Sequence, residues 1–185
     1  MTDRPMSNLS FKFMSSFFKF RDFFSSPIKI LKQIGIRPGW NILDYGAGSG
    51  SYSIPAAQLV GSTGTVYAAD IHTLAINEIR KKADMKRLKN IYTILTDCNT
   101  ELPDASMDVV LLFYVLHDFK NPDLIIKELD RVLKPRGLLS VLDHKFDKEK
   151  VISTINHATQ HFKLREAKIS SDKGKKEMLI FSKEE

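Results

Sequence analysis

The sequence predicts an α/β domain built on a mostly parallel sheet. Short apolar runs alternate with amphipathic segments over residues 41–162, a pattern typical of strands connected by helices. A glycine-rich segment at residues 46–50 follows the first of these runs. The chain closes with two strand-like runs around a short turn, and so short a connection joins only antiparallel neighbours. A chain of 185 residues fits one domain and can bury a core without metals or disulfides.

Seven strands are expected in chain order. The run 107–114 is continuously apolar, which is typical of a strand buried on both faces. The expected strands are 41–45, 65–70, 91–96, 107–114, 137–143, 163–170 and 176–182.

The expected helices carry recognisable start and stop signals. Pro27 fits the first turn of a short helix that Gly35 ends. Asn121 is an expected N-cap, with Pro122 in the first turn that follows it. The longer helices are predicted at 51–60, 73–89, 122–133 and 148–162, of which 73–89 has a very basic outer face.

Residues 1–27 are expected to form a separate, Phe-rich helical segment that precedes the domain at 28–185. Phe13, Phe17 and Phe20 lie on one helical stripe. The stripe fits a lid over a cofactor and an apolar substrate, a contact with an anionic membrane surface, or simple packing on the sheet. Charged residues interrupt its apolar stretch, so a signal peptide is not expected.

The basic excess lies in the flanks of the chain. The net charge is +6, but residues 41–144 hold 11 basic and 13 acidic side chains. A nucleic-acid groove usually needs a concentrated basic field, so nucleic acid is not the expected partner. Cys98 is the single cysteine, which rules out an intrachain disulfide and suits a cytoplasmic location.

The strand ends carry a candidate ligand site. Glycines allow close approach of backbone to a ligand, and a helix N-terminus offers N–H groups to a carboxylate. Asp44 could accept from an ammonium, Asp70 from ribose hydroxyls and Asp97 from an adenine amino group, with Ile71 on the adenine face. The loop alone also fits a tight strand-to-helix turn without a ligand. Its candidate residues are Asp44, Gly46, Ala47, Gly48, Ser49 and Gly50.

These residues resemble the class I methyltransferases that use S-adenosylmethionine (SAM), particularly the ubiquinone/menaquinone biosynthesis branch. The resemblance covers about residues 28–183 and implies a Rossmann-like seven-stranded sheet of order 3-2-1-4-5-7-6, strand 7 antiparallel, with helices on both faces. It implies SAM as co-substrate, with Cys98 and Phe113 among its contacts. Arg136 departs from the family, which often has glycine there. The matching segments are 43–52, 66–70, Asp97, 107–118 and 128–137.

The predicted reaction is methyl transfer to a small, apolar or aromatic acceptor. His117 is the tentative general base, but a role as pocket wall or a purely structural role stays open. No metal is expected: His157 and His161 have helical metal spacing but lack further ligands, which favours a solvated face.

Three other functions compete with this prediction. A dehydrogenase would need Gly-x-Gly-x-x-Gly/Ala, whereas Ser51 follows Gly50 here. A nucleic-acid methyltransferase would resemble its class in an Asn/Asp-Pro-Pro-aromatic motif, and residues 113–117 do not. A SAM-binding sensor or recruitment protein without turnover is the third. The sequence leaves a monomer and a homodimer equally open.

Overall fold

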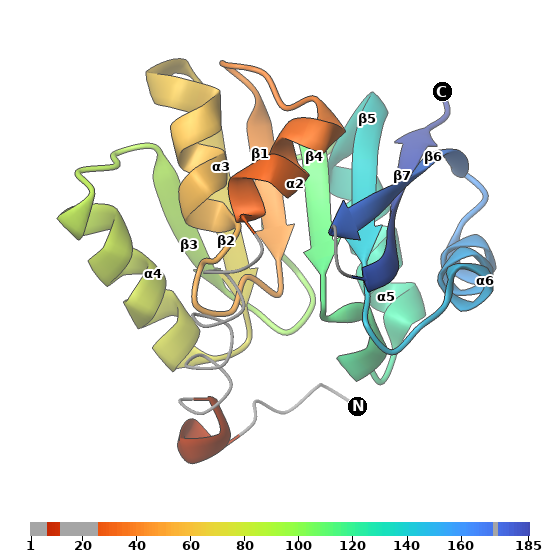
Figure 1. The fold of residues 1–185 in the computed structure, drawn as a ribbon, viewed down its shortest axis with the longest axis horizontal. Helices are drawn as coiled ribbons and strands as arrows, with labels where there is room; N and C mark the ends of the chain where they lie inside the picture. Colours follow the sequence, from red (N-terminus) through yellow and green to blue (C-terminus); the bar gives the residue numbers. More distant parts are fainter. Residues whose placement is uncertain (1–6, 12–25, 172–173) are drawn as a thin grey trace. The chain divides into compact units, whose positions relative to one another are not determined.

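The computed structural model describes residues 7–11, 26–171 and 174–185 (Figure 1). The chain forms two compact units, Met1–Asp97 and Cys98–Glu185, which are described in turn. A domain boundary between residues 27 and 28 was predicted. Most of the segment before it, residues 12–25, lies outside the described residues, so the boundary stays a prediction.

The first unit holds three parallel strands. Asp44 lies opposite Ala68, and Asp70 lies opposite Leu95, so successive carboxyl ends fall at one edge. Helices follow each of the first two strands and pack on the sheet. The strands are β1 (Asn41–Tyr45), β2 (Thr65–Asp70) and β3 (Ile91–Leu95), and the helices are α2 (Pro27–Ile34), α3 (Ser53–Val60), the 3₁₀ turn η1 (Gly61–Thr63) and α4 (Thr73–Met85).

The helix termini of this unit follow local chemistry. Pro27 begins α2 and Gly35 ends it with a left-handed φ of 82°, as predicted. Helix α4 begins at Thr73, after His72, whose ring accepts the Leu74 N–H. It ends at Met85, four residues before the predicted end, because Arg87 takes a φ of 54° that an α-helix cannot contain.

The second unit combines a parallel strand pair with a closing hairpin. Strands β4 and β5 are parallel, and β7 runs antiparallel to both β5 and β6. The elements are β4 (Met107–Phe113), the 3₁₀ turn η2 (Leu116–Asp118), α5 (Pro122–Val132), β5 (Leu133–Leu142), α6 (Lys148–Ala158), β6 (Phe162–Ser171) and β7 (Gly174–Lys183).

The strands form one sheet with the order β3-β2-β1-β4-β5-β7-β6. This order and the antiparallel β7 confirm the predicted Rossmann-like fold. The core is made of apolar strand residues; β4, for example, buries every side chain but that of Asp108. The prediction of β4 as a strand buried on both faces is therefore correct.

Some predicted bounds were wrong in this unit. Strand β5 begins at Leu133, not at residue 137, because Leu133 already pairs with Met107, and the register shifts before Leu138 pairs with Val109. Arg136 has a φ of 64°, a conformation that favours glycine, the residue that the family resemblance implies at this position. Helix α6 ends at Ala158, where Thr159 is extended.

Candidate functional site

The carboxyl group of Asp44 is buried near the end of β1. The residue is 2% exposed, and the Ser53 hydroxyl donates a hydrogen bond to its Oδ2 over 2.5 Å. The pKa of Asp44 is raised to about 7: burial raises it most, the hydrogen bonds from Ser53 lower it, and the charge of Asp70 raises it. Asp44 therefore changes protonation near neutral pH, and a cation bound beside it would favour its charged form.

The glycine loop crosses the end of the neighbouring strand. The N–H groups of Gly46 and Ala47 donate to the Ala69 carbonyl oxygen over 2.9 and 3.0 Å. A Cβ added to Gly48, where φ is 52°, would meet no atom within 4 Å. A Cβ on Gly50 would lie 2.9 Å from Ile79 Cγ1. Gly48 thus presents backbone to open space, whereas Gly50 allows close packing of α4.

The Asp70 carboxylate, at the end of β2, accepts hydrogen bonds from the glycine loop and from the segment before α4. Its two oxygens accept from the N–H groups of Gly48 and His72, each over 2.8 Å. Burial raises the pKa of Asp70 and these hydrogen bonds lower it, with a net rise. A carboxylate offers about four acceptor positions, so capacity remains for the hydroxyls of a ligand. Ile71, half-buried, follows directly.

Helix α4 also supports the glycine loop. Ala47 packs with Ala68 and Ile79 in a small apolar cluster, and the Lys82 ammonium donates to the Ser49 carbonyl oxygen. The Ser49 hydroxyl is buried and has no hydrogen-bond partner among the described residues. The first unit thus brings Asp44, the loop residues 46–50 and Asp70 together, as predicted.

Asp97 is the last residue of the first unit. It lies two residues beyond β3 and is half-buried, as is Cys98, the first residue of the second unit. Their predicted contacts with adenine stay predictions.

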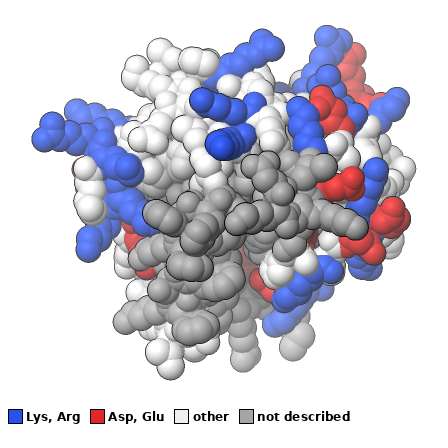
Figure 2. All heavy atoms as spheres, in the orientation of Figure 1, with Lys and Arg blue, Asp and Glu red and all other residues white. Residues whose placement is uncertain are grey.

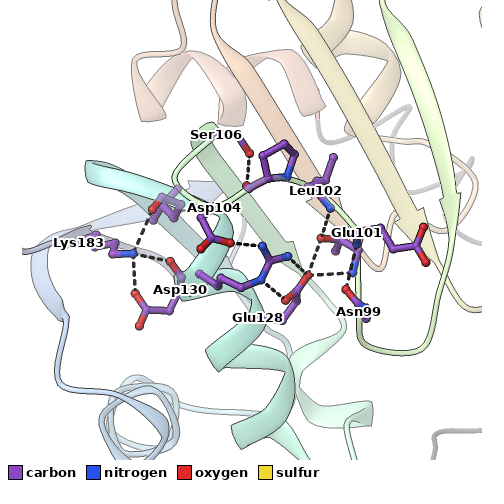
Figure 3. Close-up of polar contacts among 12 residues, drawn as sticks. Asn99, Glu101, Leu102, Asp104, Ser106, Glu128, Asp130 and Lys183 are labelled. Carbon is purple, nitrogen blue, oxygen red and sulfur yellow. Dashed lines mark hydrogen bonds and ion pairs between the residues drawn. The ribbon is translucent and has the colours of Figure 1, made fainter.

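A polar network in the second unit holds the segment that follows Cys98 (Figure 3). Glu128 of α5 accepts from the Thr100 N–H and hydroxyl over 2.8 and 2.6 Å. Arg131 binds the same carboxylate through Nε and Nη2, each over 2.8 Å, and also pairs with Asp104. Burial raises the pKa of Glu128, but the hydrogen bonds from Arg131 and Thr100 outweigh it, so the pKa is lowered.

Strands β4 and β5 place His117 against Asp143. The imidazole Nδ1 lies 2.9 and 2.8 Å from the two carboxylate oxygens of Asp143. Burial raises the pKa of Asp143, but the hydrogen bonds from Lys145, His117 and Phe146 outweigh it, so the pKa is lowered. Phe113 ends β4 in the core, 5% exposed.

The backbone between Phe113 and His117 is strained. Tyr114 has a φ of 60°, which is rare for an aromatic residue, and its N–H donates to the Leu142 carbonyl oxygen over 2.6 Å. Residues in such conformations cluster at functional sites, and this one turns the chain sharply at the end of β4.

The predicted lid residues Phe13, Phe17 and Phe20 lie outside the described residues. Within the same segment Phe11 is described: it is 1% exposed, and its ring stacks on that of His72 at 4.5 Å.

The two histidines with metal-like spacing face different carboxylates. The Nδ1 atom of His157 lies 3.1 Å from Asp123, and that of His161 lies 2.6 Å from Asp130. Both histidine side chains are largely exposed.

The sequence did not point to His72, Asp143 or the Thr100–Glu128 pair as site residues. Thr100 and Glu128 are 28 residues apart, and His117 and Asp143 are 26 apart, so no local pattern relates them. One usable signal was present, because Asp143 ends an apolar run in the same way as Asp70.

The surface of α4 is strongly basic. Figure 2 shows Lys and Arg gathered at the left of the view, over this helix. Among the described residues, no helix is both long and apolar enough to cross a bilayer. The exposed basic residues of α4 and the turn after it are Arg80, Lys81, Lys86, Arg87 and Lys89.

The sheet order and the glycine loop define an α/β protein of the Rossmann-like class. A family model described as "Methyltransferase domain" matches residues 36–183. The chain therefore belongs to the methyltransferase domain family, which confirms the resemblance predicted from the sequence.

Relatives of this chain are named as C-methyltransferases of ubiquinone/menaquinone biosynthesis. A ubiquinone/menaquinone biosynthesis C-methyltransferase UbiE from Paraburkholderia xenovorans is 35% identical over 118 residues, covering 61% of this chain and 46% of the relative. The enzyme of the same name from Hydrogenovibrio crunogenus is 37% identical over 116 residues, covering 59% and 44%. The chain spans about half the length of the curated relatives it matches.

Solved structures share the fold across nearly the whole chain. A SAM-dependent methyltransferase from Aquifex aeolicus has a TM-score of 0.81 at 24% identity, covering 96% of this chain and 98% of that one. A putative S-adenosyl-L-methionine-dependent methyltransferase from Methanococcus maripaludis has a TM-score of 0.79 at 18% identity, covering 100% and 98%.

Proposed function

We propose that this chain transfers a methyl group from SAM to a small, apolar or aromatic acceptor. The observation that carries the proposal is the arrangement at the ends of β1 and β2. There, the buried Asp44, the glycine loop and the Asp70 carboxylate meet within one unit of a methyltransferase-family chain. Acidic groups at successive strand ends suit a ligand that carries an ammonium and a ribose.

Each part of the ligand has a chemical counterpart in this unit. Asp44 and Asp70 supply acceptors for the ammonium and the ribose hydroxyls, and the open backbone at Gly48 admits the ligand without a Cβ clash. Asp97 and Cys98 would meet the adenine. The two buried carboxyl groups raise the free energy of the empty site, and the positive charge of SAM relieves this repulsion.

The acceptor is inferred from chemistry and from the names of the relatives. Enzymes named for ubiquinone and menaquinone biosynthesis act on a quinone pathway, and reduced quinones are apolar aromatic diols. The proposed roles of His117 as general base and of the Phe-rich segment 1–27 as lid follow from such an acceptor. A cytoplasmic location and contact of that segment with a membrane remain predictions.

Calorimetric titration with S-adenosylhomocysteine, the demethylated product, tests the cofactor site. Asp70→Ala is expected to weaken binding by about 1–3 kcal/mol, as for a lost hydrogen bond to a charged group. Asp84→Ala, which removes an exposed carboxylate from α4, serves as the matched control. Equal affinity in the two variants would remove Asp70 from the site.

Turnover separates an enzyme from a SAM sensor. The chain is incubated with SAM and a panel of phenols, aromatic diols and amines, and formation of S-adenosylhomocysteine is followed. We expect turnover with at least one aromatic diol. Tight binding of the product without turnover across the panel would favour the sensor instead.

A further inference from the structure

The side chains of His117 and Asp143 form a buried pair at the carboxyl ends of two neighbouring parallel strands. The His117 side chain is 4% exposed and that of Asp143 is 0% exposed. Strands β4 and β5 are paired up to Phe113 and Leu142, and the Tyr114 N–H extends this pairing by one more hydrogen bond. The pairing therefore brings the segments that carry the two side chains close together. Ligands of open α/β sheets bind at this end of the strands.

The hydrogen atoms in this pair can be assigned from the donors around Asp143. Oδ1 accepts from the Lys145 N–H over 2.8 Å and the Phe146 N–H over 3.1 Å, and Oδ2 accepts from the His117 N–H over 3.3 Å. These donors stabilise the charged carboxylate, which has no proton to give. The His117 Nδ1 must therefore carry the hydrogen that joins the two side chains. In the neutral ring, Nε2 then holds the lone pair.

Exposed side chains adjoin the Nε2 atom of the buried His117 ring. Asp118 Oδ1 lies 3.2 Å from Nε2, where it can accept a hydrogen bond once Nε2 has taken the proton of the acceptor, and the Asp118 side chain is 55% exposed. The Lys145 ammonium pairs with the same carboxylate at 3.8 Å. The ring of His144, an exposed residue, meets that of His117 edge-on at 4.5 Å. Asp118 and His144 thus adjoin the His117 ring with exposed side chains, and an acceptor reaches Nε2 when these side chains rotate.

A metal site is the competing interpretation of this cluster. One ligand atom each from His117, Asp143 and His144 lies within 4.8 Å of the others. However, both oxygens of Asp143 already accept N–H hydrogen bonds, and a cation would have to replace these donors. Carboxylates that bind cations keep lone pairs directed at the ion. The observed donors therefore suit an orienting carboxylate better.

We propose that Asp143 is a positioning residue that holds His117 in the tautomer needed to deprotonate the acceptor. This proposal rests on the proposed function. The His117 Nε2 lone pair takes the proton from the acceptor hydroxyl, and the O–H electron pair passes to the acceptor. The acceptor then forms a bond to the methyl carbon of SAM while the carbon–sulfur bond breaks and its electron pair stays on sulfur. The products are the methylated acceptor, S-adenosylhomocysteine and a proton on His117, which leaves to solvent.

Asp143→Asn changes the hydrogen bonding of this pair but hardly its shape. The amide oxygen is expected to stay with the Lys145 and Phe146 N–H groups, which turns the NH₂ group toward His117. That group can only donate, so Nδ1 must become the acceptor and the hydrogen moves to Nε2. The ring then has no lone pair for the acceptor hydroxyl. Asp123→Asn is the matched control, because it makes the same change in the exposed His157–Asp123 pair of the same unit.

The tautomer is measured directly by long-range proton–nitrogen correlation spectra of the chain labelled with ¹⁵N-histidine. The chain has five histidines, and His117→Gln assigns the signal. We expect the Nδ1–H form in the natural chain and in Asp123→Asn, and the Nε2–H form in Asp143→Asn. An Nε2–H signal in the natural chain, or no change in Asp143→Asn, would overturn the assigned positioning role.

Kinetics test the catalytic consequence, with SAM and 1,4-dihydroxynaphthalene as the probe acceptor. General bases contribute about 10²–10⁴-fold, so kcat in Asp143→Asn is expected to fall by about 10²-fold, with KM and S-adenosylhomocysteine affinity changed less than about threefold. In the His117→Gln background, Asp143→Asn is expected to have no further effect. A full second loss there would show that Asp143 acts independently of His117, and would contradict the inference.

Two outcomes separate this inference from the proposed function. A natural chain that binds S-adenosylhomocysteine and methylates the probe, while Asp143→Asn keeps its kcat, refutes the inference alone. A natural chain that neither binds S-adenosylhomocysteine nor turns over refutes both.

Discussion

Asp44→Asn is expected to stabilise the folded chain at pH 8 and to leave its stability nearly unchanged at pH 4. Burial raises the pKa of Asp44 from 3.8 to about 7. Between these two values the folded chain holds a proton that the unfolded chain releases. Stability therefore falls as pH rises through this window, and the loss is complete above pH 7. The neutral amide of asparagine removes this loss.

The magnitude follows from the same two values. At about 1.4 kcal/mol for each pKa unit, the difference between 3.8 and about 7 corresponds to about 4 kcal/mol as an upper limit. The amide oxygen can still accept from the Ser53 hydroxyl, so the hydrogen bond is retained. We therefore expect a gain on the order of 1–4 kcal/mol at pH 8.

Urea unfolding between pH 4 and pH 9 measures this difference. Asp84→Asn is the control, because it removes an exposed carboxylate from the same unit. The reasoning is refuted if the stability difference between Asp44→Asn and the natural chain does not grow with pH, or if Asp84→Asn gives the same curve. A gain in stability with a loss of SAM affinity would fit a carboxylate retained for binding.

Two further variants test the packing and the polar network. Gly50→Ala is expected to lower the free energy of unfolding by more than about 2 kcal/mol, because a left-handed φ of 79° costs about 1–2 kcal/mol and the new Cβ meets Ile79. Gly35→Ala is the control: its φ is 82° but its Cβ would lie in open space, so it should show the cost of the φ angle alone. Urea unfolding measures both variants. Glu128→Gln is expected to cost about 1–3 kcal/mol at pH 7. That cost should vanish as pH falls through the lowered pKa of Glu128, since the protonated natural side chain then resembles glutamine. A loss that persists at low pH would contradict the charged network.

The fold could be predicted from the sequence because the patterns that indicate strands, helices and turns are local and recur along the chain. The buried run at β4 and the short closing turn each limit the possible pairings, and together they gave the strand types and the antiparallel end of the sheet. The misplaced bounds have local causes of a different kind. Arg87 and Arg136 take left-handed φ values that their residue type does not predict.

The candidate site was predictable where it consists of strand ends. Asp44 and Asp70 each close an apolar run, and parallel pairing brings such ends together. The pairs His117–Asp143 and Thr100–Glu128 were not predictable, because each joins segments more than 20 residues apart through side-chain geometry alone. Partners of this kind become visible only when the register of the sheet and the position of α5 are known.

The most direct test of the central claim is a calorimetric titration of the natural chain with S-adenosylhomocysteine, with NADH in a parallel titration. We predict saturable binding of one molecule of S-adenosylhomocysteine per chain and no measurable heat from NADH. Saturable binding of NADH without binding of S-adenosylhomocysteine would show that the ends of β1 and β2 hold a different ligand, and would contradict the methyl-transfer proposal.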